Sequence, residues 1–405
     1  RVLEDGRYGF AHLVDPSGAQ RAVSEAISIA RKSPMISGFE LPSNQQSSSV
    51  GGMLDKEILS LSPEDLLEQG DYVLTKVTEL DSRAVAVGGG IGIVASASSI
   101  VNSNGIEDGG LRTSHAIGIH VSIDENGDLT SSYESASSRK LLKDITKPVE
   151  KAVHWSQVTR NKISGGDTSD CPVLLTPESF SPLFSMVAPP ALSGERMARN
   201  ESFWSGKMDN IVIADHLTMK NDGRMEGGSS SGSRDGEGVP TRTTNLIEDG
   251  RLKSQLWSTR DAAKMVAEGM IDRAESTGSA TRSSHTAPPG CGCSDLHLIS
   301  KNKQYSREQL IEEMEEGYVI HSVMGAHTAN PTSGDFSVTT STILRVESGE
   351  VVGALSQAGF SGNMAKALAG NVVLGDLISK RGSYTSGTMH VPDVLMYDSL
   401  RVNPA

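Results

Sequence analysis

One short stretch of the chain, SSHTAPPGCGCSDLH, combines the side chains that bind zinc: His285, Cys291, Cys293 and His297. Imidazole nitrogen and thiolate sulfur are the ligands of tetrahedral zinc sites, so three or four of these residues could hold a metal ion. The C-x-C spacing is tighter than the usual C-x2–4-C, and the Pro-Pro-Gly sequence at 288–290 marks a loop that need not fold back. The sequence therefore favours a loop with reduced thiols, and zinc binding is the weaker alternative.

Other signatures of hydrolytic chemistry are missing. HExxH does not occur and no histidine is followed by glutamate, so zinc and its general base are not delivered together on a helix. No GxSxG joins a strand to a helix, and there is no Walker A sequence. The run Gly88–Gly92 lacks a following Lys-Ser/Thr and is interpreted as strand glycines or a bulge. We expect the remaining histidines to be hydrogen-bonded structural residues: His12, His115, His120, His154, His216, His321, His327 and His390.

Several glycine-rich and polar blocks lie beside predicted strands. They are Gly236–Arg242, Ser276–Gly278, Gly325–His327 and Asn330–Ser337. Glycine in or beside a strand often marks the close approach of another backbone, and an extended peptide added to a sheet edge would be such a backbone. Ordinary turn chemistry explains the same residues, and composition does not choose between the two interpretations.

The elements that must position these residues begin with short strands and amphipathic helices. Asp5-Gly6 predicts a hairpin turn, and a helix follows with Val23, Ala26, Ile27 and Ala30 on one face, ending before Pro34. Ser62-Pro63-Glu64 predicts the start of a helix that runs to about Leu80. The remaining predictions for this half are a surface loop over 38–52, strands over 84–101 interrupted by Gly88–Gly90, hairpin turns at Asn104-Gly105 and Asn126-Gly127, and a helix over 140–162.

The second half is predicted to begin near Cys171, with a strand over 172–176 and a helix from Glu178. The Gly/Ser-rich stretch from Gly227 to Gly238 has no regular period and predicts an exposed loop. Further predictions are a hairpin joining 241–247 to 252–257, a helix over 261–270, a helix capped by Ser306 that runs to Glu316, and a hairpin joining 337–346 to 351–355. Because strands predominate and are mostly joined by hairpins, the predicted fold class is α+β.

Length and charge limit the possible classes of protein. The 405 residues suggest two domains, which we place at 1–170, an N-terminal α/β domain, and 171–405, a C-terminal domain rich in antiparallel strands. There are 37 Lys+Arg against 50 Asp+Glu, and a net charge of −13 argues against nucleic-acid binding. No stretch is apolar enough to span a membrane, and three cysteines suit a reducing cytoplasm. The start on Arg1 leads us to expect no signal peptide and a missing N-terminal segment.

A set of uncommon blocks in one order resembles the TldD/PmbA family, also called modulators of DNA gyrase. The blocks are DGRYGFA, EGVPTR, IEDGRLKSQL, STG, GAH with NPTSGDFSV, ESGEVV, SGN and Gly375-Asp376, and they cover essentially the whole chain. The resemblance implies a two-domain α+β fold with an N-terminal α/β part and a C-terminal part rich in antiparallel strands. It also implies assembly as dimers. In that family the bacterial pair TldD and TldE forms a zinc peptidase that acts on unfolded or short peptides.

The family's zinc ligands are absent from this chain. TldD-type subunits carry HExxxH on a helix and a cysteine late in the chain. Here the corresponding helix reads Ser179–Pro190 without a histidine, and the late region Lys380–Thr385 has no cysteine. The chain therefore resembles the TldE/PmbA-type subunit.

The leading hypothesis from this resemblance is a non-catalytic subunit of a TldD/TldE-type metallopeptidase complex. It would have no cofactor of its own, and zinc would be held by a TldD-like partner. The alternatives are a self-standing homodimeric protein-binding regulator and an autonomous metalloenzyme that uses the cysteine segment. No nucleic-acid or membrane partner is expected. The candidates for lining a peptide cavity or touching the other subunit are Gly238, Val239, Pro240, Thr241, Arg242, Gly325, His327, Asn330, Gly334, Asp335, Phe336 and Ser337.

Overall fold

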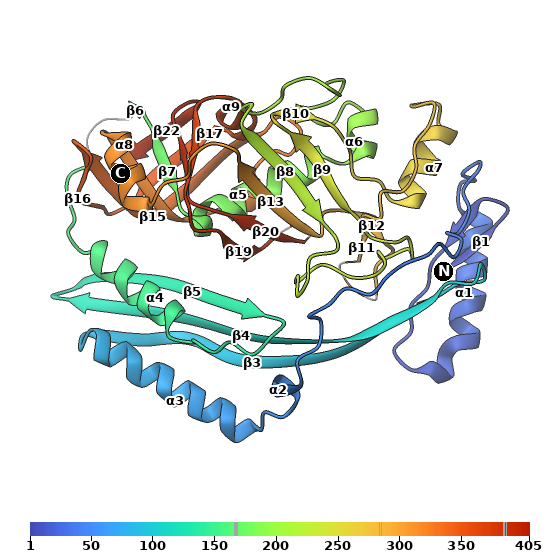
Figure 1. The fold of residues 1–405 in the computed structure, drawn as a ribbon, viewed down its shortest axis with the longest axis horizontal. Coiled ribbons are helices and arrows are strands. Elements are labelled where there is room, and N and C mark those ends of the chain that lie inside the picture. Colours follow the sequence, from blue (N-terminus) through green and yellow to red (C-terminus); the bar gives the residue numbers. More distant parts are fainter. Residues whose placement is uncertain (166–168, 283, 285, 384, 386) are drawn as a thin grey trace.

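The N-terminal part is built on an antiparallel sheet of order β3-β4-β5. This computed structural model describes residues 1–405 except 166–168, 283, 285, 384 and 386. The long strands of the sheet form a ribbon that runs beneath the rest of the molecule (Figure 1). Its strands are β3 (Ala84–Val101), β4 (Glu107–Glu125) and β5 (Asp128–Ser138). Alternate residues of β4 point to one face, where Ile117, Ile119, Val121 and Ile123 are buried against α3 (Pro63–Leu80) and α4 (Lys147–Val158).

Local signals predicted most of this half correctly. Ser62 caps α3 in a capping box with Asp65, and both Asn-Gly hairpin turns are present. Two predictions are wrong in detail. The glycines at 88–90 do not interrupt the strand, because β3 continues through a bulge between Ala86 and Gly88. The helix predicted over 140–162 is shorter, since α4 begins at Lys147, where Pro148 occupies its first turn.

The first residues form a small unit at the far end of the β3–β4 ribbon, opposite α3 (Figure 1). The predicted hairpin is β1 (Val2–Glu4) with β2 (Arg7–Gly9), and the predicted helix is α1 (Ala19–Lys32). The face of α1 turned to the hairpin is lined by small side chains, Ala22, Ala26 and Ala30. A short turn η1 (Pro16–Gly18) precedes α1, and α2 (Lys56–Leu59) follows a long connection without regular structure.

The C-terminal part contains two larger sheets that share one hydrophobic core. The larger has the order β18-β21-β7-β14-β15-β17-β22-β6, with β16 also on β15, and the other has the order β10-β9-β8-β13-β20-β19. Pairing is antiparallel except for β7 with β14 and β13 with β20. The strands of the first sheet are β6 (Ser169–Asp170), β7 (Val173–Leu175), β14 (Gly317–Met324), β15 (Asp335–Glu347), β16 (Glu350–Leu355), β17 (Ala358–Asn363), β18 (Val372–Leu374), β21 (Val394–Met396) and β22 (Leu400–Pro404). Those of the second are β8 (Leu217–Asp222), β9 (Thr243–Glu248), β10 (Arg251–Leu252), β13 (Asp295–Ser300), β19 (Ser379–Gly382) and β20 (Thr388–Val391).

Helix α5 (Pro177–Ala191) lies at the centre of this part and is buried along most of its length (Figure 1). Phe180 and Phe184 stack on each other with ring centroids 4.9 Å apart. The other elements lie around the sheets: α6 (Gly194–Ala198), α7 (Thr259–Ala267), α8 (Arg307–Met314), η2 (Ala326–Thr328), α9 (Met364–Ala369), and the strands β11 (Ala280–Thr281) and β12 (Gly290–Cys291). The described part of the chain contains no helix with both the length and the apolar character to cross a membrane.

The mixture of helices with mostly antiparallel sheets confirms the predicted α+β class. The strand before α5, the helix capped by Ser306 and the hairpin of β15 with β16 are also confirmed. The hairpin of β9 with β10 is present, but β10 ends at Leu252. The helix predicted over 261–270 begins and ends earlier, as α7. The division at residue 170 stays a prediction.

The exposed loop predicted over Gly227–Gly238 is wrong, because every residue of that segment is buried or half-buried. The segment folds back onto the end of β8 and the start of β13, where Ser231 Oγ contacts Asp222 O and Asp295 Oδ2. Ser231 and Asp235 are among its buried polar residues. The Gly/Ser-rich composition without a regular period predicted an exposed loop, but hydrogen bonds from neighbouring elements satisfy the polar groups of the segment.

Candidate functional site

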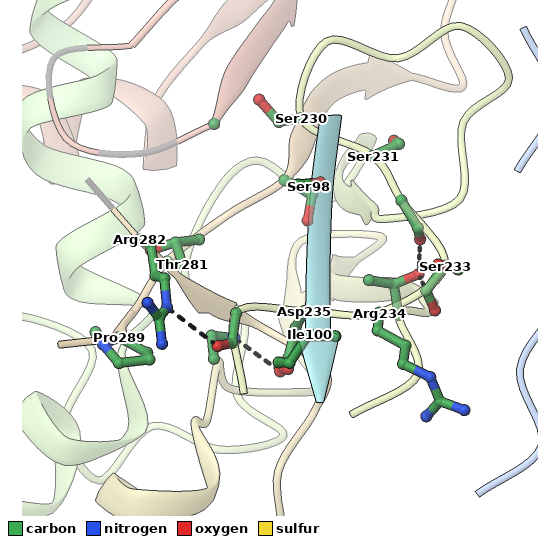
Figure 2. A pocket seen from close by; sticks show the side chains of 18 of the residues that line it. Ser98, Ile100, Ser230, Ser231, Ser233, Arg234, Asp235, Thr281, Arg282 and Pro289 are labelled. Atoms are coloured by element: carbon green, nitrogen blue, oxygen red, sulfur yellow. Dashed lines mark hydrogen bonds between the residues drawn. The ribbon is translucent and has the colours of Figure 1, made fainter. Parts of the chain in front are cut away.

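A large cavity of about 2150 Å³ lies between the β3–β4 ribbon and the C-terminal part. It exceeds the roughly 300–1,000 Å³ of typical small-molecule pockets, so it has room for a segment of polymer. Ser96–Val101 of β3 and Glu107–Arg112 of β4 form one wall. The other walls come from the loops at 47–50 and 230–236, from the end of α5, and from β11 and β12. Figure 2 shows Ser98 and Ile100 on the strand, with Ser230, Ser231 and Ser233 on the loop beside it.

The Gly/Ser loop, residues 227–234, is held in the cavity wall by Asp295 of β13. One carboxylate oxygen, Oδ2, accepts hydrogen bonds from Ser230 N at 3.1 Å and from Ser231 Oγ at 2.8 Å. The other, Oδ1, lies 2.8 Å from Nε2 of His390 in β20. Burial alone would raise the pKa of Asp295, but the bonds from His390 and Ser231 outweigh it, and the pKa is lowered. Asp295 is therefore a charged anchor for the loop.

A second buried carboxylate, Asp235, shapes the turn that follows the Gly/Ser loop. Its Oδ1 accepts from the backbone N–H groups of Glu237, Gly238 and Val239, and its Oδ2 accepts from Ala280 N. Burial raises the pKa of Asp235 to about 6, against the effect of these backbone donors. The turn in this way becomes a rigid part of the cavity wall. The pattern Asp-Gly-Glu-Gly is a turn signal that sequence reasoning could have used to place this carboxylate.

Six arginines and five carboxylates contribute charges to the cavity wall. Arg234 pairs with Asp108, Nε to Oδ2 at 3.0 Å. Arg260 lies with its guanidinium carbon 5.3 Å from the centre of the Tyr8 ring, and Arg282 Nε donates to Gly236 O at 3.4 Å. Arg112 and Arg196 also line the cavity, and neither forms an ion pair with a residue that the structure describes. The sequence did not single out these arginines, because they come from distant segments.

The two segments that by resemblance would carry zinc ligands meet at this cavity. Pro189 and Pro190 at the end of α5 line its wall, as does Thr385 after β19, and Thr385 Oγ1 donates to Ser185 O at 2.8 Å. Both segments lack histidine and cysteine. Among the described residues, no three His, Cys, Asp or Glu side chains gather as metal ligands. The residues present at this place therefore do not fit a zinc ion.

The cysteine segment also lies at the cavity, where Cys291 and Cys293 line the wall. Burial raises the pKa of both thiols, that of Cys293 to about 12, so both are protonated at neutral pH. His297 lies on β13, where its ring stacks on His390 with centroids 4.3 Å apart, and burial lowers its pKa to about 4. His285 lies outside the described residues. Cys291, Cys293 and His297 therefore give no support to zinc binding by the cysteine segment.

A buried polar cluster joins β5 of the N-terminal sheet to the C-terminal part. Glu134 Oε1 lies 2.6 Å from Nε2 of His321 in β14, and Thr176 Oγ1 lies 3.0 Å from Nδ1 of the same ring. Arg381 of β19 contacts both Glu134 and Glu178. Glu134, His321 and Thr176 are arranged like an acid–base relay. Thr176 is fully buried and His321 is 2% exposed, so a substrate does not reach them. Their role is structural.

The candidate blocks from sequence analysis are not brought into one site. Thr241 is the one of the twelve candidates that lines the large cavity. Gly238 lies nearby with φ +103°, where a Cβ atom would come 2.9 Å from Cδ1 of Ile106. Gly325–Gly334 instead forms the connection from β14 to β15, in which Asn330 Oδ1 accepts from Thr332 N at 2.9 Å, and Asp335, Phe336 and Ser337 begin β15. This is turn chemistry, while a contact of these residues with a second subunit stays a prediction.

The other candidates in these two blocks differ in how far they are buried. Val239 and Phe336 are buried, and Phe336 belongs to the main core. Asp335 accepts a hydrogen bond from Nδ2 of Asn363 at 2.7 Å. The remaining candidates range from buried Gly334, through half-buried Pro240 and Gly325, to exposed Arg242, His327 and Ser337.

Comparison with known proteins gives one consistent picture. Residues 168–398 match the family model of the PmbA/TldA metallopeptidase C-terminal domain. The chain is 27% identical over 387 residues to an uncharacterized protein of Methanocaldococcus jannaschii, covering 95% of this chain and 86% of that protein. It is 25% identical over 411 residues to the metalloprotease PmbA of Escherichia coli O157:H7, covering 97% and 84%. The crystal structure of TldE from Thermococcus kodakarensis has a similar fold, with a TM-score of 0.88, 24% identity, and coverage of 100% of this chain and 89% of that one.

Proposed function

Since the chain belongs to the TldD/PmbA family, we propose that it is a TldE/PmbA-type subunit that pairs with a TldD-like zinc metallopeptidase. In this proposal the chain has no catalytic metal. It completes a chamber in which unfolded or short peptides are held for cleavage by the partner.

The observation that carries the proposal is the meeting of α5 with the segment after β19. A hydrolytic zinc site needs three protein ligands of nitrogen, oxygen or sulfur around an open position. The contact of Thr385 with Ser185, beside Pro189 and Pro190, offers hydroxyls and proline rings at that place. The supporting geometry is thus a cavity of peptide size in which the place where α5 meets the segment after β19 has no histidine or cysteine.

The cavity wall also suits an extended peptide. β3 pairs with β4 on one side, and no described residue pairs with its outer edge. Its segment Ser96–Val101 lines the cavity and carries no charge. Main-chain hydrogen bonds to an open edge give affinity without much dependence on sequence. This supports binding of unfolded chains with broad specificity.

The test is reconstitution with a TldD-like chain that carries HExxxH. Peptidase activity of the mixture should vanish when the partner's zinc-binding histidines are replaced, and should survive Cys291→Ser and His297→Gln in this chain. Loss of activity with either of these two variants, when the variant protein stays folded and associated, would contradict the proposal.

The assembly state separates the proposal from the alternative of a self-standing regulator. A stoichiometric complex with the TldD-like chain in size-exclusion chromatography with light scattering is the expected result. A stable homodimer that ignores that chain would instead favour the regulator.

A further inference from the structure

Three cations surround the Gly/Ser loop where it lines the cavity. Arg112 comes from β4, Arg139 follows β5, and Lys380 lies on β19. Arg139 Nη1 donates to Thr113 O at 3.3 Å and its Nη2 to Ser229 O, while Lys380 Nζ donates to Ser229 Oγ at 3.1 Å. A Cβ atom on Gly232 would lie 2.5 Å from Nη2 of Arg112, so this glycine leaves room for the guanidinium group. Segments far apart in the sequence thus place three positive charges around one loop.

The positive charge of this group is not balanced by neighbouring carboxylates. None of the three cations forms an ion pair with a residue that the structure describes. Asp295 is close enough to influence Arg139 and Lys380, but its oxygens already accept from Ser230, Ser231 and His390. Arg139 and Lys380 therefore share one carboxylate that is already hydrogen-bonded, and Arg112 has no carboxylate partner among the described residues.

Burial makes this excess of charge costly. All three side chains are half-buried, and Nε of Arg139 is buried without a hydrogen-bond partner among the described residues. The pKa of Arg139 is lowered by burial and then by the charge of Arg112, and the pKa of Lys380 is lowered by burial with Arg139 adding to it. Because desolvated charges are favoured by a partner of opposite sign, an anion that reached this half-buried group would be bound favourably.

We propose that Arg112 and the hydroxyl of Ser230 form a subsite in the cavity that binds a carboxylate of the peptide, with Arg139 and Lys380, which hold Ser229 of the same loop, adding positive charge. The inference rests on the proposed function, because a peptide is the ligand that brings the carboxylate. Arg112 and Ser230 line the large cavity, Lys380 lines a separate one of about 300 Å³, and Arg139 is among the lining residues of neither. A guanidinium fork binds carboxylates with two parallel hydrogen bonds, and Arg112 has its donors free of described partners. The carboxylate is the C-terminus of the peptide or an acidic side chain.

The test uses three fluorescent peptides of one sequence and measures their Kd by anisotropy with the complex of this chain and a TldD-like partner whose zinc-binding histidines are replaced. The first has a free C-terminus, the second a C-terminal amide, and the third an amide with one internal Gln→Glu change. The first is expected to bind about tenfold or more tightly than the second, which is the range for a hydrogen bond to a charged group. Recovery of binding by the third assigns the subsite to side-chain carboxylates, and no recovery assigns it to the terminus.

Arg112→Gln is the decisive variant. No residue that the structure describes forms an ion pair with Arg112, so its replacement should leave the melting temperature unchanged. It should remove most of the difference between the first two peptides. Arg21→Gln, on the exposed face of α1, is the matched control and should keep the difference.

Two results would overturn the proposal, and they are distinguishable. Equal binding of the acid and amide peptides by the unaltered chain would refute the subsite and leave peptide binding intact. Failure of all three peptides to bind would refute the proposed function and the subsite together.

Discussion

Removal of the Glu134 carboxylate should destabilise the protein strongly, because this group joins the two parts of the molecule. Glu134 is 1% exposed, lies 2.6 Å from the His321 imidazole and 3.5 Å from the Arg381 guanidinium, and comes from the N-terminal sheet, whereas both partners belong to the C-terminal part. After replacement of Glu134 by alanine, Arg381 keeps its ion pair with Glu178. Nε2 of His321 loses the carboxylate that lies beside it.

The expected cost follows from the burial of the cluster. Breaking a buried ion pair by removing one partner costs about 3–5 kcal/mol of unfolding free energy when the remaining charge has no other partner. Because Arg381 keeps Glu178, we expect the loss to lie toward the lower end of that range. Loss of a buried hydrogen-bond acceptor contributes within that range, at about 1–3 kcal/mol. Glu134→Gln keeps an oxygen for the imidazole and loses the charge, so its effect should be smaller than that of Glu134→Ala.

Urea denaturation, followed by tryptophan fluorescence, measures this effect, since Trp155 stacks on His321 with centroids 3.8 Å apart. The matched control is Glu347→Ala, which removes the same side chain from the half-exposed pair with Arg345 on β15. An exposed pair of this kind contributes about 0–1 kcal/mol. Equal small losses of unfolding free energy for Glu134→Ala and Glu347→Ala would refute the reasoning.

Three further predictions concern single residues. Burial lowers the pKa of His297 to about 4, so between pH 6.5 and 4 the unfolded chain binds a proton that the folded chain does not. The stability of the protein should therefore fall as the pH falls through this window. His297→Gln should flatten the dependence of the melting temperature on pH. Because burial raises the pKa of Cys293 to about 12, iodoacetamide at pH 8 should label it far more slowly in the native than in the unfolded protein, as read by mass spectrometry, and equal rates would contradict the burial. Gly238→Ala should cost about 1–3 kcal/mol of unfolding free energy, because alanine is strained at φ +103° and would press on Ile106. Gly90→Ala, where no atom lies within 4 Å of the added methyl group, is its control and should change stability little.

Local sequence signals predicted most elements of the fold because their physics is local. The cap at Ser62, the hairpin turns and the helix capped by Ser306 depend on residues within one or two turns of each other. Errors arose where distant contacts decided the outcome. β3 continues through the glycines because β4 pairs along its whole length, and the Gly/Ser loop is buried because Asp295 anchors it.

The candidate site was only partly predictable for the same reason. The sequence by itself determined the absence of histidine from α5 and of cysteine from the late region, and the blocks that indicate the family. Only the tertiary structure brought α5 and the segment after β19 to one cavity wall, and gathered Arg112, Arg139 and Lys380 around one loop. Residue type is a property of the chain, whereas burial, shared hydrogen bonds and the balance of charges depend on which distant segments the fold places side by side.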